Sequence, residues 1–131
     1  MRWDDVVRAM KAALDGDAQL TAIMGARKLE PLESTTSRTV PSIRYTVVSD
    51  VEGEVMESVT VQLDYWANGR AQAVAIEQRI RAVLSHPTRR DFGGVNMATL
   101  FYGGRDSSDP EPGVVHRQVD FRFAPVRSIY T

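Results

Sequence analysis

Apolar residues recur at every third or fourth position at the start of the chain. This spacing places them on one stripe of an amphipathic helix, which we expect to end at Gly16. Asp17 is then expected to cap a second, short helix that ends at Gly25. The residues of the first stripe are Trp3, Val6, Val7, Met10 and Leu14. Residues 1–25 therefore predict two consecutive helices.

The period changes to two after Pro41, where apolar and polar residues begin to alternate. This first alternating run leads into an acidic turn at residues 50–54, and a second run covers residues 55–66. Two alternating runs around a short turn are typical of a β-hairpin. The preceding residues 27–32 predict a short extended segment.

A helical period returns between about residues 70 and 85. Pro87 is expected to end this helix, because the residue before a proline disfavours helical backbone angles. Two more strands are expected at about residues 95–102 and 114–126. The residues between them, 103–113, are hydrophilic and predict a loop.

The order of these elements, α-α-β-β-α-β-β, defines an expected fold class. Because hairpins build antiparallel sheets, we expect an α+β fold in which helices pack on one face of an antiparallel, mixed-hairpin sheet. A length of 131 residues fits a single domain, expected over residues 1–131. Hydrophobic residues make up 43% of the chain and charged residues 25%, which excludes a collagen-like, coiled-coil or disordered chain.

Charge and cysteine content narrow the classes of function. The net charge of −1 gives no basic field, so non-specific nucleic-acid binding is not expected. The absence of cysteine excludes disulfides, thiolate metal sites and a cysteine nucleophile. No apolar run approaches the ~20 residues that cross a membrane. The acidic start, with Asp4 and Asp5, does not resemble a signal peptide, so we expect an unprocessed cytoplasmic protein.

Residues that could carry catalysis or bind a metal are few. We expect the two histidines, His86 and His116, to be solvated or locally hydrogen-bonded, and no Gly-x-Ser-x-Gly motif accompanies them. The tripeptide Asp91-Phe92-Gly93 matches the magnesium-binding motif of kinases, but the other kinase motifs are absent. The sequence therefore predicts no catalytic residue, no cofactor and no metal site.

Three large apolar side chains interrupt the polar side of the predicted hairpin. Val48, Met56 and Trp66 alternate onto faces that a solvent-exposed sheet would leave polar. Trp and Met are enriched at interface cores, so we expect these residues, together with Arg38, at an interface with another subunit or protein. Packing beneath the N-terminal helices is the alternative that the pattern leaves open.

Several short motifs occur together in an order and spacing that resemble a known family. This arrangement is similar to the tail-terminator, or tail-completion, proteins of long-tailed bacteriophages, and the resemblance covers nearly the whole chain. The motifs are Val6-Val7-Arg8-Ala9-Met10, Asp17-Ala18-Gln19-Leu20 before Gly25-Ala26-Arg27, Val40-Pro41-Ser42-Ile43, Val61-Gln62-Leu63-Asp64-Tyr65-Trp66 before the helix 71–84, and His116-Arg117-Gln118-Val119-Asp120-Phe121-Arg122-Phe123.

The resemblance implies a structural virion protein without catalysis or cofactor. Its copies would form a homohexameric ring that caps the tail tube, ends tube polymerisation and provides the head-tail joining interface. The implied partners are other copies of the chain, the tail tube protein and a head-side connector or stopper protein, with no membrane. The implied location is the tail-neck region of the virion, after assembly in the host cytoplasm.

The same resemblance gives the acidic turn a role. DNA would pass through the ring lumen without specific binding, and Asp50, Glu52 and Glu54 are the candidate residues that face this lumen. Their negative charge would keep DNA from adhering.

Two other functions remain open at this stage. One is a different neck component, such as a head-completion stopper, which shares the structural class but not the docking partner. The other is a small α+β enzyme or ligand-binding domain, which would need a concave pocket with convergent polar groups.

Overall fold

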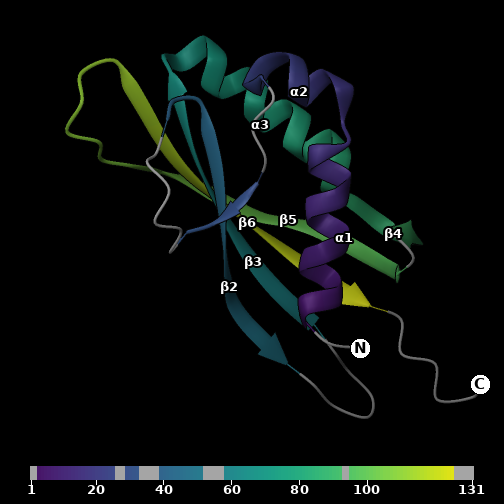
Figure 1. Cartoon of the computed structure of the whole chain (residues 1–131). Helices are drawn as coiled ribbons and strands as arrows, with labels where there is room; N and C mark the ends of the chain where they lie inside the picture. The colour runs from purple at the N-terminus through teal and green to yellow at the C-terminus, as the bar shows by residue number, and fades with distance from the viewer. Residues whose placement is uncertain (1–2, 26–28, 33–38, 52–57, 93–94, 126–131) are drawn as a thin grey trace, which may run out of the picture.

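A computed structural model describes residues 3–25, 29–32, 39–51, 58–92 and 95–125 of the chain (Figure 1). Helices and strands follow one another along the chain in the order α-α-β-β-β-α-β-β-β. The elements are α1 (Trp3–Asp15), α2 (Ala18–Met24), β1 (Glu30–Pro31), β2 (Ser42–Val51), β3 (Ser58–Asn68), α3 (Arg70–Leu84), β4 (His86–Phe92), β5 (Val95–Ser107) and β6 (Val114–Pro125).

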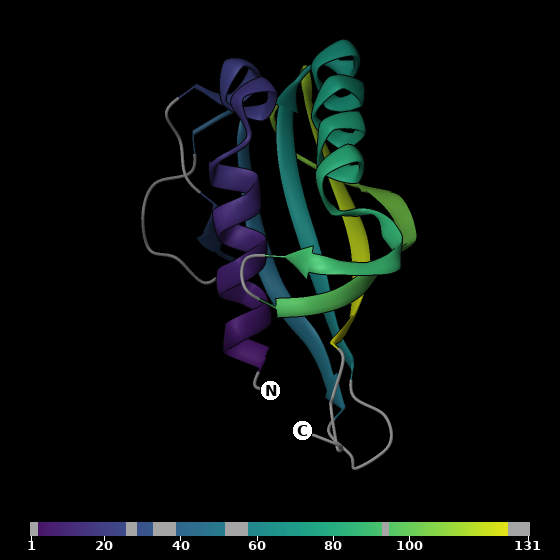
Figure 2. The same cartoon turned by 90° about the vertical axis from the view of Figure 1, so that its right-hand side faces the viewer.

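The strands form one sheet in the order β1-β2-β3-β6-β5-β4. The short edge pair β1–β2 is parallel, and the other pairs are antiparallel. The described helices lie on one side of this sheet (Figures 1 and 2). The sheet is strongly twisted, so β4 and the beginning of β5 curve towards α1 (Figure 2). The expected α+β class with helices on one face is confirmed.

Both N-terminal helices have the predicted boundaries. The side chain of Asp17 caps α2 by accepting a hydrogen bond from the backbone N–H of Leu20 at 2.9 Å, and Gly25 follows the last helical residue with a φ of +77°. Asp17 also links α2 to α3, because the Arg79 guanidinium donates to its two carboxylate oxygens at 2.7 and 3.0 Å. This hydrogen bonding lowers the pKa of Asp17 below its ordinary value.

Two strands depart from the predicted element order. The extended segment near residues 27–32 contains a two-residue strand, β1, which pairs with β2. Residues 86–92 form β4, a strand that the sequence did not predict. The predicted loop at 103–113 is also shorter, because β5 continues to Ser107. β4 is an edge strand paired only with β5 among the described strands, so its sequence needs no apolar alternation.

The hydrophobic core lies between the helices and the inner face of the sheet. On β3 the odd-numbered residues are fully buried, and they meet the apolar stripe of α1 and one side of α3. The residues at its centre are Val6, Met10 and Leu14 of α1, Val59, Val61, Leu63 and Tyr65 of β3, Ile76, Ile80 and Leu84 of α3, and Val119, Phe121 and Phe123 of β6. Each fully buried aliphatic side chain stabilises the fold by about 1.5–3 kcal/mol.

Candidate assembly surfaces

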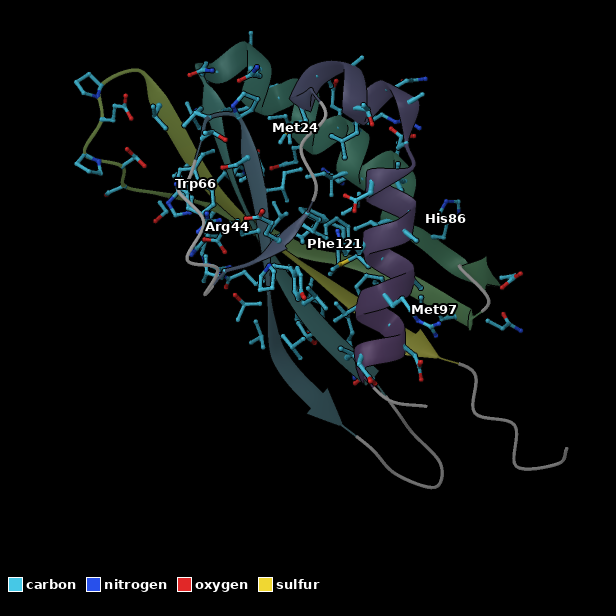
Figure 3. All side chains as sticks on the ribbon, viewed as in Figure 1. Met24, Arg44, Trp66, His86, Met97 and Phe121 are labelled. Carbon is cyan, nitrogen blue, oxygen red and sulfur yellow. The ribbon has the colours of Figure 1, made fainter. Side chains whose placement is uncertain are left out.

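The even-numbered residues of β3 and β6 point away from the helices, because side chains alternate along a strand and the odd-numbered residues lie in the core. We call this side of the sheet the outer face. Figure 3 shows Trp66 of β3 and Arg44 of β2 on the outer face, and Phe121 and Met97 on the side of α1. The outer face of the two central strands carries Ser58, Thr60, Gln62, Asp64, Trp66, His116, Gln118, Asp120 and Arg122.

A buried carboxylate lies at the centre of the outer face. Asp64 is only 2% exposed, although no described helix covers it. Its oxygens bond to His116 Nε2 at 2.8 Å, Gln118 Nε2 at 3.1 Å and Gln62 Nε2 at 2.8 Å. Arg44 lies opposite Asp64 on β2 and forms an ion pair with Glu30 at 3.9 Å. Asp64 is therefore an integral part of a polar network rather than a solvated surface acid.

Arg105 extends this network across three strands. Its guanidinium donates to Gln118 Oε1 at 3.0 Å, Asp120 Oδ2 at 3.0 Å and Gln62 Oε1 at 2.7 Å. The side chains of β3, β5 and β6 thus hold each other in fixed orientations. A surface with its side chains already ordered loses less conformational entropy when a partner binds.

Trp66 lies on the predicted polar side of β3 but is only 4% exposed. Its ring stacks on that of His116, with centroids 4.3 Å apart and planes 18° from parallel. Trp66 is not part of the hydrophobic cluster beneath the helices. Most of its side chain is therefore covered within the subunit, at a position on the outer face.

Two β-bulges present exposed apolar side chains. Val48 is the extra residue where β2 pairs with β3, and Tyr102 is the extra residue where β5 pairs with β6. Val48 is 57% exposed, Tyr102 is 66% exposed, and the neighbouring Leu100 is 46% exposed. Val47, Val61, Phe121 and Phe101 form one row across the sheet, so the two bulges lie at a similar level on either side of the central strands.

The sequence-based hypothesis identified Val48 but not Leu100 or Tyr102. Leu100 and Tyr102 alternate along β5 with the inward-facing residues Met97 and Phe101. This alternation was the sequence signal that could have placed them on the opposite face of the sheet.

Two of the predicted contact residues, Met56 and Arg38, lie outside the described residues. Glu52 and Glu54 of the predicted lumen-facing turn also lie outside them. Asp50 lies on β2 opposite Val59, and its side chain is not described.

A second polar surface lies on the helix side, between α3 and the hairpin of β5 and β6. It is a cleft of about 330 Å³. On one wall Tyr65 donates its hydroxyl to Glu77 at 2.9 Å, and Arg117 contacts both Glu77 and Asp106, the latter at 3.2 Å. Burial and the Glu77 carboxylate raise the pKa of Tyr65, and the same carboxylate raises the pKa of Arg117.

The described residues contain no group of three or more His, Asp and Glu side chains placed to hold a metal ion. His116 is the hydrogen-bonded partner of Asp64, and His86 lies at the start of β4. None of the helices that the structure describes is long and apolar enough to span a membrane.

Comparisons with known proteins match the fold and identify a family. The virion of a native gene transfer agent particle contains a chain with a TM-score of 0.67 and 13% identity, over 90% of this chain and 92% of that one. A second solved structure gives a TM-score of 0.65 and 13% identity over 98% of both chains. No curated protein sequence matches the chain. The family model of tail completion protein gp17 matches residues 8–124. The chain therefore belongs to the tail completion protein gp17 family and is a structural protein of a virion tail.

Proposed function

We propose that this protein is a tail terminator. Its copies assemble into a homohexameric ring that caps the tail tube, ends tube polymerisation and joins the tail to a head-side connector or stopper protein. The family match over residues 8–124 supports this proposal, and so does the similar fold of a chain in a gene transfer agent virion. The protein then acts in the tail-neck region after assembly in the host cytoplasm.

The observation that carries the proposal is the outer face. Val48, Leu100 and Tyr102 expose apolar surface on a sheet whose neighbouring polar side chains are fixed by the Asp64 and Arg105 networks. A surface that combines exposed apolar side chains with a hydrogen-bonded polar network is typical of an interface between proteins. We assign this face to contact with a neighbouring subunit or with the tube.

The lumen of the ring is assigned by charge. Asp50, Glu52 and Glu54 lie close together in the sequence at the β2–β3 connection. Like charges repel the DNA phosphates, so an acidic lumen lets DNA pass without specific binding.

Adding one negative charge at each bulge tests the assignment of the outer face as a contact surface. We expect Val48→Asp and Tyr102→Asp to reduce ring formation and tube capping at least tenfold, while the free energy of unfolding changes by less than ~0.5 kcal/mol because both side chains are exposed. Sedimentation of each variant measures ring formation, and electron microscopy of tubes polymerised with it measures tube capping. Urea unfolding measures the free energy of unfolding.

Ala12→Glu is the matched control, because it adds a negative charge at an exposed position of α1 on the opposite side of the sheet. This variant should cap tubes as the unmodified protein does. Normal capping by both bulge variants would show that the outer face is not the contact surface.

A further inference from the structure

The cleft between α3 and the β5–β6 hairpin carries an unbalanced charge. Its two carboxylates, Glu77 and Asp106, are both engaged by Arg117. Arg70 and Arg81 also line the cleft and are exposed. Among the described residues Arg70 has no hydrogen-bond or ion-pair partner, and Arg81 lies over the Phe101 ring at 4.0 Å from its centroid. The rim of the cleft is therefore positively charged.

The lining of the same cleft is partly apolar. Val74 of α3 is 48% exposed there, and Ala73 and Val115 also line it. An occupant that fits this cleft combines a carboxylate for the arginines with a small apolar surface for Val74.

The turn between β5 and β6 has these properties. Residues 108–113 read Ser-Asp-Pro-Glu-Pro-Gly, with two carboxylates, two prolines and no basic residue. The turn extends past the end of α3 (Figure 1), and Glu111 is exposed. Asp109 Oδ1 accepts a hydrogen bond from the Glu111 backbone N–H at 2.9 Å, which fixes the turn.

We propose that residues 108–113 of one copy dock into the cleft of the next copy. Glu111 of the turn pairs with Arg70 at the rim, and the proline rings lie against Val74. The prolines and the Asp109 bond keep the turn ordered before it binds, which reduces the entropy lost on contact. This inference rests on the proposed ring, because a turn and a cleft are different surfaces and such head-to-tail contacts close by rotation.

Cross-linking tests the contact directly. The chain has no cysteine, so Val74→Cys in the cleft and Ser108→Cys in the turn introduce the sole thiols. Both positions are exposed, and both substitutions leave Arg70 and Glu111 unchanged. When the two single variants are mixed and oxidised, we expect a disulfide-linked heterodimer well above either homodimer. Ala12→Cys mixed with Ser108→Cys is the control and should yield no such excess.

Charge reversal tests whether the arginine rim recognises the turn. Arg70→Glu in the Val74→Cys protein should lower the heterodimer yield ~5-fold, and Glu111→Arg in the Ser108→Cys protein should do the same. The two reversals together should restore most of the yield, because the pair is then re-formed with opposite polarity. Circular dichroism of each variant checks that it is folded.

The outcomes separate this inference from the proposed function. A protein carrying both cysteines should give a covalent ladder that ends at six subunits, which supports the contact and the ring. Six-fold rings without heterodimer would overturn the turn-in-cleft contact and leave the proposed function standing. A heterodimer whose ladder ends at another number would support the contact and contradict the hexamer. Absence of both would contradict both.

Discussion

Asp64 provides the sharpest test of how the outer face is held together. Its carboxylate is 2% exposed and bonds to His116, Gln118 and Gln62 at 2.8–3.1 Å. Replacing it with alanine removes the acceptor from all three side chains at once. Replacing it with asparagine keeps the size of the side chain and one acceptor oxygen, but places an N–H₂ group among the donors.

The expected magnitudes follow from these contacts. A buried hydrogen bond to a charged group contributes about 1.5–3 kcal/mol, and a buried donor left without its acceptor costs about 1–3 kcal/mol. Gln62 and Gln118 are half-buried and regain water, which offsets part of this cost. We therefore expect Asp64→Ala to destabilise the subunit by about 3 kcal/mol and Asp64→Asn by about half as much.

Urea unfolding followed by circular dichroism measures both effects. For a domain of this length, 3 kcal/mol also corresponds to a melting temperature about 12 °C lower. Glu111→Ala is the matched control, because it removes an exposed carboxylate and should change the free energy of unfolding by less than ~0.5 kcal/mol. A cost below ~1 kcal/mol for Asp64→Ala would refute the claim that this carboxylate organises the outer face.

Substitutions at Asp17 and at the acidic turn test the α2 cap and the proposed lumen. Asp17→Ala should cost about 1 kcal/mol through the lost cap of α2, and more through the lost contact with Arg79. The pKa of Asp17 is lowered in the folded state, so its stabilisation is present above the ordinary value of 3.8 and is lost as the pH falls through the folded-state pKa. Urea unfolding should therefore show a stability difference between variant and parent that shrinks as the pH falls below 3.8, and a difference that stays the same as the pH is lowered from 7 into this range would contradict this reasoning. For the lumen, lysine at both Glu52 and Glu54 should slow DNA ejection from assembled particles, and unchanged ejection would remove these residues from the lumen.

Local sequence signals predicted much of the helical layer and the central strands. The α1 stripe, the Asp17 cap and the alternation of β3 depend on residues close in sequence, so their spacing alone is informative. β4 was missed because its residues His86–Phe92 do not alternate, and its pairing depends on β5. Edge strands of this kind are set by their partner rather than by their own pattern.

The candidate surfaces were harder to predict because they depend on register. Asp64 and His116 are 52 positions apart, and Glu77 and Arg117 are 40 apart. The pairing of β3 with β6 brings the first pair together, and the packing of α3 on the sheet brings the second together. The exposure of Val48 and Tyr102 likewise follows from two bulges, whose positions the alternation does not fix.

The most direct test of the central claim is the mass of the particle that the protein forms. Light scattering over a wide concentration range, with and without purified tail tubes, should find a particle of six 14.6-kDa subunits, and electron microscopy should show its central hole. Binding to a tube end stabilises the assembled state, so tubes should lower the concentration at which the ring appears. A monomer at every concentration that also leaves tube ends uncapped would contradict the tail-terminator function.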